Sequence, residues 1–335
     1  MKRILILGTS ALLALCAFLG CARQPTESKA NPESERISIV TTTGMITDLA
    51  TRIAGDRAEI TGLMGSGIDP HLYTPTRSDI QKLLGADVVL YNGLHLEGKM
   101  GDALERVAGS GKTVRAVTEE IDESYLLTPA QFNGHHDPHV WMDPAAWAES
   151  AAVIRDTLSG YDPEGAEQYA VNAQTVINEI NALDNYAERV LHSVPEDRRV
   201  LVTAHDAFSY FGRRYGYEVV GIQGISTESE AGVRDLERIV SLLVDRKIRA
   251  VFVETTVSER NIRALIAGAK ARGHEVIIGG NLFSDAMGAR GTYEGTYVGM
   301  IDHNVTTIVR SLGGDAPEHG MQGKLGESPS TKESP

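Results

Sequence analysis

The sequence predicts an α/β protein with two doubly wound, Rossmann-like lobes, each with a parallel sheet, joined by one long backbone helix. Short apolar runs alternate with helical spacing in the first half, the alternation returns in the second half, and a long apolar stripe lies between them. Near-continuous apolar strands that alternate with helices are typical of a parallel sheet covered on both faces. At 335 residues the chain is also long enough for two cores.

The first residues have the pattern of a bacterial export signal. A basic start precedes an apolar run over residues 4–19, which ends at Gly20 and Cys21. Residues 18–21 resemble the lipobox of bacterial lipoproteins, so we expect a signal peptide over 1–20 and a lipid on Cys21, the first mature residue. An uncleaved membrane helix is the alternative, but the run is short for a span of about 20 apolar residues.

The sequence after Cys21 indicates how the folded part is attached to the membrane and which atoms in it can bind a metal. Residues 21–35 are rich in Pro, Ser, Glu and Lys, which indicates a flexible tether. We therefore expect an extracytoplasmic protein, lipid-anchored to the bacterial cell membrane in the periplasm or at the cell surface. Since no cysteine follows Cys21, any metal in the folded part must be bound by nitrogen and oxygen.

Residues 36–161 are expected to form the N-terminal metal-binding lobe. Short apolar runs here predict strands, and segments with apolar residues three and four apart predict helices between them. The strands are expected at residues 37–40, 58–60, 88–91 and 114–117, and the helices at 45–53 and 78–84.

The longest helical pattern covers residues 162–195 and predicts the linking helix. Asp162 is expected to cap this helix, with Pro163 at its first position, and Pro195 ends it. Apolar residues recur at steps of three and four along the whole segment, which gives one continuous stripe. A helix of this length spans roughly 45 Å, enough to lie behind both lobes.

Residues 196–312 repeat the alternation and are expected to form the C-terminal metal-binding lobe. From residue 313 to 335 the sequence has no periodicity, which predicts a disordered tail. The strands of this lobe are expected at residues 200–204, 219–222, 250–254 and 276–278, and the helices at 206–215, 231–246 and 259–272.

Composition and charge exclude several classes of protein. An apolar share of 42% and a charged share of 23% exclude collagen-like, mostly disordered and polytopic membrane proteins. The net charge of -13 repels the phosphates of nucleic acids, and no basic, aromatic-rich stretch offsets it. We therefore expect no nucleic-acid partner.

Three histidines and one aspartate are placed as metal ligands would be. An Asp-Pro-His tripeptide occurs twice, ending in His71 and in His139, in turn-rich loops where proline fixes the backbone. His205 follows a buried strand directly, and Asp285 follows another. Because ligands of open α/β sheets collect at the carboxyl ends of strands, we expect two ligands from each lobe to face a shared cleft.

This set of ligands favours particular metals. Three neutral imidazoles and one carboxylate suit zinc, and they also suit manganese or ferrous iron if the carboxylate binds through both oxygens. Asp143, Asp206 and Glu254 are candidates to orient the imidazoles, and helix capping is the alternative for the two aspartates. Five histidines lack a polar companion at ligand spacing and are expected to be structural: His95, His192, His274, His303 and His319.

Six motifs together carry a resemblance to a known family. Through them the chain, from about residue 36 to 312, resembles the zinc- and manganese-type (TroA-like) solute-binding lipoproteins of bacterial ABC importers. The motifs are Asp69-Pro70-His71 with Tyr73 and Pro75, Asn92-Gly93-Leu94 with Leu96-Glu97, Asp137-Pro138-His139-Val140-Trp141 with Asp143-Pro144, Thr203-Ala204-His205-Asp206-Ala207-Phe208, Gly224-Ile225-Ser226-Thr227, and Phe283-Ser284-Asp285 with Gly295-Thr296-Tyr297.

The resemblance implies a function and a site. It places the four metal ligands at His71, His139, His205 and Asp285, in a cleft between two lobes joined by a long helix. It implies a monomeric, non-enzymatic receptor without a catalytic cofactor, which captures zinc or manganese, or iron, and delivers it to the permease of an ABC importer.

The resemblance leaves the identity of the metal open. Family members associated mainly with manganese often have Glu at the third ligand, where this chain has His205. Zinc-dedicated members often have a long His-rich loop before the second ligand, where this chain has His135 and His136.

Three other functions are alternatives to the metal receptor. A secreted zinc hydrolase keeps an open coordination position and a nearby base, but the sequence contains no His-Glu-x-x-His segment, and a fourth protein ligand closes the site. A surface adhesin with an incidental metal and a receptor for a metal chelate are the others. A chelate receptor requires a wide aromatic or basic pocket instead of four protein ligands.

Overall fold

The computed structural model describes residues 36–132 and 134–326 of the chain. The expected signal peptide, the lipid-bearing Cys21 and the tether therefore lie outside the described residues. From Arg36 onward the chain is one compact unit. Within the described ranges, no helix combines the length and the apolar character needed to cross a membrane.

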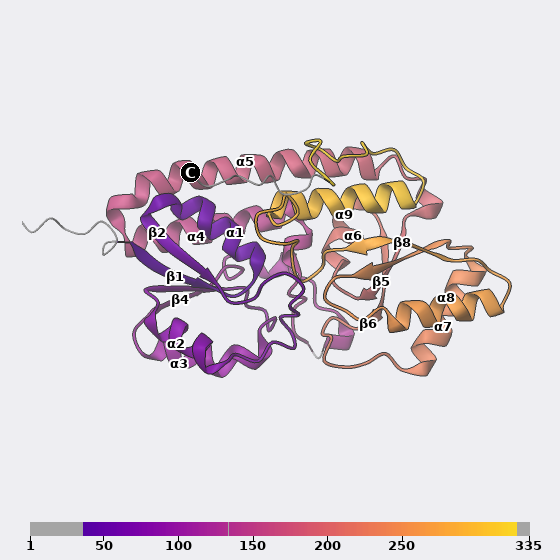
Figure 1. Cartoon of the computed structure of the whole chain (residues 1–335), viewed down its shortest axis with the longest axis horizontal. Coiled ribbons are helices and arrows are strands. Elements are labelled where there is room, and N and C mark those ends of the chain that lie inside the picture. Colours follow the sequence, from indigo (N-terminus) through magenta and orange to yellow (C-terminus); the bar gives the residue numbers. More distant parts are fainter. Residues whose placement is uncertain (1–35, 133, 327–335) are drawn as a thin grey trace, which may run out of the picture. The chain divides into compact units, whose positions relative to one another are not determined.

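The first lobe is built on a four-stranded parallel sheet in the order β2-β1-β3-β4. Side chains alternate between its faces, so Ile39 and Val88 belong to one buried cluster, whereas Val40 and Val89 belong to another. Helices cover both faces (Figure 1). The elements are β1 (Ile37–Thr41), α1 (Gly44–Ala54), β2 (Ala58–Gly62), α2 (Arg77–Gly85), β3 (Val88–Tyr91), α3 (Gly101–Gly109) and β4 (Thr113–Ala116).

The second lobe also contains parallel strands, β5 paired with β6 and β7 with β8, and β5 lies beside β7. Leu201 and Phe252 face a cluster shared with α6 and α9, while Val202 and Val251 face α7 and α8. The predicted parallel α/β lobes are thus confirmed. The elements are β5 (Val200–His205), α6 (Ser209–Tyr215), β6 (Glu218–Gln223), α7 (Val233–Asp245), β7 (Ala250–Glu254), α8 (Arg260–Ala271), β8 (Ile277–Leu282) and α9 (Tyr297–Ser311).

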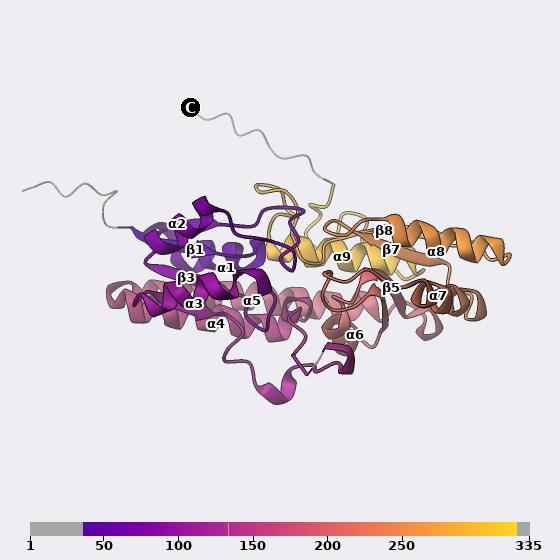
Figure 2. The same ribbon diagram turned by 90° about the horizontal axis from the view of Figure 1, so that it is seen from below.

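The long helix α5 (Ala166–Leu191) runs behind both lobes, with α4 (Pro144–Tyr161) beside its first half (Figures 1 and 2). As predicted, Asp162 stands at the N-cap position of the helical segment with Pro163 after it, but the first turn (Pro163–Gly165) is 3-10 and the Asp162 side chain makes no capping hydrogen bond. Its carboxylate instead accepts hydrogen bonds from Arg57 and Tyr169, and α5 begins after a 3-10 turn. Apolar side chains of α5 belong to the buried cluster that contains Ile39 of β1 and Phe252 of β7. One core therefore continues from the first lobe into the second.

Short 3-10 turns complete the described secondary structure and lie mainly in the loops of the first lobe. They are Gly55–Arg57, Gly98–Met100, Glu123–Tyr125, Ala130–Phe132, Val140–Met142, Pro163–Gly165 and Glu196–Arg198.

The C-terminal segment corrects one prediction. A disordered tail over residues 313–335 is wrong for residues 313–326. The backbone N–H of Met321 donates to the carboxylate of Asp302 in α9, at 2.9 Å from each oxygen, and Leu325 is buried. Tertiary contacts order this segment. Because such contacts produce no periodic pattern in the sequence, the sequence did not reveal them. Residues 327–335 lie outside the described part of the chain.

Candidate metal centre

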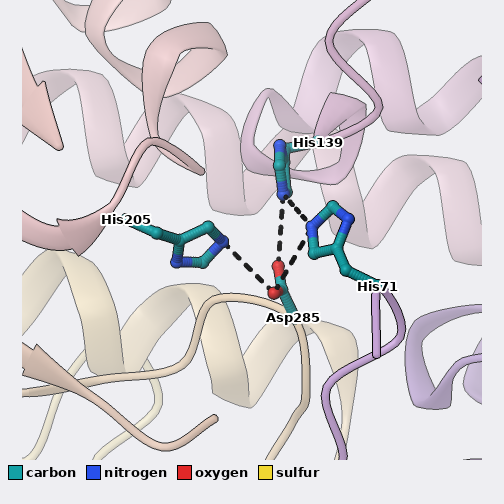
Figure 3. Close-up of side chains that lie close together, drawn as sticks. All are labelled: His71, His139, His205 and Asp285. Atoms are coloured by element: carbon teal, nitrogen blue, oxygen red, sulfur yellow. Dashed lines mark hydrogen bonds and ion pairs between the residues drawn. The ribbon is translucent and has the colours of Figure 1, made fainter. Parts of the chain in front are cut away.

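Four side chains from four separate segments of the chain converge on one point between the lobes (Figure 3). His71 lies in the loop from β2 to α2, and His139 lies in the loop from β4 to α4. His205 is the last residue of β5, and Asp285 lies in the loop after β8. All four positions lie at or after the carboxyl ends of parallel strands, where ligands of open sheets bind. The structure thus brings together the four residues predicted as ligands.

The donor atoms are spaced as ligands around one ion would be. One atom from each of the four residues can be chosen so that all lie within 4.8 Å of one another. Nε2 of His139 lies 3.3 Å from Nε2 of His71 and 3.3 Å from Oδ1 of Asp285, and Nε2 of His205 lies 3.2 Å from Oδ2 of Asp285. Tetrahedral zinc with bonds of about 2.0–2.1 Å has ligand atoms about 3.3 Å apart.

Several of these donors are buried without a hydrogen-bond partner. His139 and His205 are fully buried, and Asp285 and His71 are only 2% and 3% exposed. Among the described residues, Nε2 of His205 and both carboxylate oxygens of Asp285 have no hydrogen-bond partner. Such groups are costly to bury unless they are paired or coordinate a metal. The donor set therefore fits a bare cation.

Glu254 orients the ring of His205, as predicted. Its Oε2 lies 2.5 Å from Nδ1 of His205, and its Oε1 accepts the backbone N–H of His205 at 2.9 Å. A proton on Nδ1 that is donated to Glu254 leaves the lone pair of Nε2 directed at the centre. Carboxylates in this position fix the tautomer and raise the basicity of a metal-binding imidazole.

Asp137 plays the same part for His139 and was not predicted. Its Oδ1 lies 2.7 Å from Nδ1 of His139 and accepts that residue's backbone N–H at 3.0 Å. In the other Asp-Pro-His tripeptide, Oδ1 of Asp69 accepts the backbone N–H of His71 at 2.9 Å. The repeated tripeptide was the available signal, because its aspartate lies two residues before the histidine in both copies.

The other two predicted orienting residues have different contacts. Asp143 caps α4 by accepting the backbone N–H groups of Ala145 and Ala146, and it also accepts the hydroxyl of Tyr125. Asp206 accepts the hydroxyl of Ser209 at 2.7 Å. The capping alternative is therefore correct for Asp143.

The four candidate ligands, called the quartet below, have pKa values that the protein shifts in different directions. Burial lowers the pKa of His71 to about 3. Burial also acts to lower the pKa of His139, but Asp137 and Asp285 outweigh it and raise the pKa to about 9. Burial opposes ionisation of Asp285, yet His205 and His139 hold the pKa of its carboxyl well below the usual value. A metal ion must therefore compete with protons for His139.

One of three aromatic side chains that neighbour candidate ligands in the sequence lies against such a ligand in the structure. The ring centroid of Trp141 is 5.1 Å from that of His139. Phe208 packs against Phe211, whereas Phe283 packs against His303. The three aromatic residues that flank the candidate ligands in the sequence therefore serve different parts of the core.

Four of the five histidines expected to be structural contact a backbone carbonyl oxygen. The distances are 2.7 Å from His192 to Glu188, 2.7 Å from His274 to Ile248, 2.9 Å from His303 to Asn281 and 3.0 Å from His319 to Leu325. His95 differs, because its ring packs against that of His135, with centroids 4.1 Å apart.

Sequence comparison matches most of the chain to a known family. The family described as "Zinc-uptake complex component A periplasmic" (ZnuA) matches residues 39–311. The chain is 45% identical to the manganese-binding lipoprotein MntA of Bacillus subtilis (strain 168) over 303 residues, which cover 90% of this chain and 97% of that protein. It is 46% identical to the zinc-binding protein TroA of Treponema pallidum (strain Nichols) over 274 residues, 82% of this chain and 88% of that protein.

Structural comparison agrees with the sequence comparison. The solved structure of the periplasmic zinc-binding protein TroA from Treponema pallidum matches with a TM-score of 0.80 at 46% sequence identity. The match covers 83% of this chain and 99% of that chain.

Proposed function

We propose that this chain, which belongs to the zinc-uptake complex component A periplasmic family, captures a divalent transition metal between its lobes and delivers it to an ABC importer. Its similar relatives bind manganese or zinc, as their names state. The family consists of metal-binding transport proteins, which confirms the expectation of a receptor and not an enzyme. The comparisons give no support to a hydrolase or an adhesin.

The convergence of four buried donor groups at the centre carries this proposal. Three imidazoles can each present one neutral nitrogen, and Asp285 adds a carboxylate whose two oxygens have no hydrogen-bond partner within the described part of the chain. A chelate receptor would leave space for an organic ligand between these side chains, but four pairs of their donor atoms lie only 3.2–3.8 Å apart, and one donor atom from each residue lies within 4.8 Å of the others. The cargo is therefore a bare ion held by His71, His139, His205 and Asp285.

Elemental analysis of protein purified without chelators tests this assignment. We expect one zinc or manganese ion per chain, and we expect Asp285→Ala and His205→Ala to lose it. His192→Ala is the matched control, since the His192 ring contacts the backbone carbonyl of Glu188 in its own helix turn and is not part of the metal centre, and it should retain the ion. A wild-type protein that binds no ion at saturating metal overturns the proposal.

The cargo is zinc or manganese, with ferrous iron as a further candidate of the same chemistry. Nitrogen-rich sites bind zinc more tightly than manganese, so the purified protein should have the higher affinity for zinc whichever metal the cell imports. His205→Glu replaces a nitrogen by harder oxygens and should narrow the ratio of zinc to manganese affinity. An unchanged ratio would show that His205 does not bind the ion.

The proposal also places the protein outside the cytoplasm, anchored to the cell membrane by lipid on Cys21. Residues 1–20 are then removed as a signal peptide, and 21–35 form the tether to a lobe of 36–161, a linking helix of 162–195 and a lobe of 196–312. Two or three acyl chains hold a protein firmly where one does not. Cys21→Ser should release soluble, metal-binding protein; a variant that stays in the membrane fraction contradicts the lipid anchor.

The partners in this proposal are the metal ion and the permease of an importer, and the receptor itself acts as a monomer. Light scattering of the Cys21→Ser protein should give the mass of one chain with and without zinc. A dimer in either state would contradict the monomer.

A further inference from the structure

A second pair of histidines lies outside the quartet, on a cavity that reaches it. A cavity of about 210 Å³ is lined by His71, His95, His135 and Glu228, among others. His95 and His135 come from different loops, 40 positions apart in the sequence, yet their ring centroids are only 4.1 Å apart. Both are exposed to solvent, whereas His71 is buried. The cavity therefore joins an exposed pair of imidazoles to a buried candidate ligand.

The backbone that carries His95 adopts an unusual conformation. Gly93, Leu94 and His95 have φ angles of 86°, 53° and 65°, so three consecutive residues are in the left-handed region. Glycine adopts this region freely, but Leu and His rarely do, and such residues persist only where the surroundings hold them. A regular turn would direct the side chain of position 95 elsewhere.

A buried carboxylate holds this turn in place. Oε1 of Glu97 accepts the backbone N–H of Asn92 at 2.7 Å and the hydroxyl of Thr42 at 2.6 Å, and Oε2 accepts the backbone N–H of Gly93 at 3.2 Å. Glu97 is only 4% exposed. Contacts with a buried side chain thus hold the start of the turn that carries His95.

The second lobe supplies an acidic group to the same cavity. Glu228 lies one residue after Thr227, whose hydroxyl donates to Oδ2 of Asp69 at 2.6 Å and so joins the loop of His71 to the second lobe. Lys99 approaches Glu228 only to 4.0 Å, and both side chains are exposed. Two imidazoles and a carboxylate, all exposed, therefore line the same cavity as His71.

We propose that His95 and His135, assisted by Glu228, form a loading site that receives a partly hydrated divalent metal ion and passes it through the cavity to His71. This inference rests on the proposed function of the inner site. Within the described ranges, the quartet is the one group whose donors from three or more such side chains lie within 4.8 Å of one another. The outer site therefore keeps water on the metal and binds it weakly, which suits rapid transfer inward.

Stopped-flow kinetics of zinc binding tests the loading site. The ring of Trp141 lies against His139, so tryptophan fluorescence should report the filling of the inner site. In the double variant His95→Ala/His135→Ala we expect the association and dissociation rate constants to fall together, by about fivefold or more, with the dissociation constant unchanged. An intermediate site on the binding path speeds association and dissociation of zinc by the same factor, so the dissociation constant does not change.

The control is His192→Ala/His274→Ala, which also removes two imidazoles but affects neither the cavity nor the quartet. It should keep both wild-type rate constants. If the wild type binds zinc and the loading-site variant has unchanged rates, the loading site is wrong and the receptor stands. If the dissociation constant of the variant rises while its dissociation rate constant does not fall, His95 and His135 stabilise the zinc-bound state. That result would also contradict a loading site. A wild type that binds no zinc instead overturns the proposed function.

A direct readout uses nickel as a paramagnetic probe. With the inner site filled by one equivalent of zinc, small additions of nickel should broaden the ring-proton resonances of His95 and His135 before those of His192 and His274. Equal broadening of all four would contradict a loading site.

Discussion

Trp141 donates its indole N–H to the backbone carbonyl oxygen of Ser284 at 2.8 Å, and this bond joins the loop of His139 to the loop of Asp285. The backbone carbonyl of Trp141 in turn accepts the hydroxyl of Tyr297 at 2.8 Å. Trp141 and Tyr297 are both fully buried. The two lobes are therefore tied directly behind the candidate metal centre.

Replacing Trp141 by phenylalanine should loosen this tie. The variant leaves the carbonyl of Ser284 without its donor, and we expect a loss of about 1–3 kcal/mol in the free energy of unfolding, with weaker zinc binding. Trp147→Phe is the matched control, because Trp147 is equally buried but its indole N–H has no partner among the described residues. Denaturant unfolding of both variants measures the difference, and equal losses would contradict the role of the bond.

Glu254→Gln should weaken metal binding without unfolding the protein. The glutamine still fills the site but no longer presents a charged acceptor to Nδ1 of His205, so we expect zinc affinity to fall about tenfold or more. Asp206→Asn, beside His205 in the sequence but bonded to Ser209, should change affinity much less. Titration calorimetry measures both, and a similar loss in the two variants would argue against an orienting role for Glu254.

Protons should compete with the metal between about pH 6 and pH 9. The pKa of His139 is raised to about 9 in the folded protein without metal, so this group stabilises that state below its unfolded pKa of about 6.5. The stabilisation is lost as the pH rises towards 9. Zinc must displace this proton, so the increase in melting temperature on zinc binding should grow from pH 6 to pH 9. A constant increase across this range would contradict proton competition at His139.

His71 should have the opposite effect on the metal-free protein at low pH. Its pKa is lowered to about 3 by burial, while the unfolded chain takes up the proton near pH 6.5. The unfolded state therefore binds more protons between these values, and this group destabilises the fold as the pH falls from about 6.5 towards 3. His71→Gln should reduce the loss of stability over this range, measured by urea unfolding; an unchanged slope would contradict the prediction.

Metal release should involve only a small opening of the lobes. The buried cluster that contains Ile39 of the first sheet and Phe252 of the second continues through α5, so a wide hinge would break one core. We expect the X-ray scattering profiles of metal-free and zinc-loaded protein to overlay closely, with the motion shared among loops. A large change in the radius of gyration would contradict the continuous core.

Much of the fold could be predicted because buried parallel strands leave a strong signal in the sequence. The predicted strands at residues 88–91 and 250–254 agree with β3 and β7, both of which are almost entirely apolar. The Asp162-Pro163 pair starts the linking segment as predicted, but its first turn is 3-10 and the Asp162 side chain does not make the expected capping hydrogen bond. Asp162 instead pairs with Arg57 of the first lobe, and a contact of this kind has no local signature.

The candidate site shows the same limit of sequence reasoning. The four converging side chains could be predicted because each follows a strand end or a proline-fixed turn. Asp137 was missed, although it lies inside a motif already singled out, because capping and turn formation explain an aspartate there equally well. The pairing of His95 with His135 depends on the left-handed turn at Leu94 and on Glu97, which only the folded structure brings together.

The position of the bound ion tests the central claim most directly. Crystals of the zinc-loaded protein, measured at the zinc absorption edge, should show one strong anomalous peak per chain. We expect this peak within about 2.0–2.2 Å of Nε2 of His71, His139 and His205 and of a carboxylate oxygen of Asp285. A strongest peak elsewhere in the chain, with no peak among these four side chains, would contradict the account.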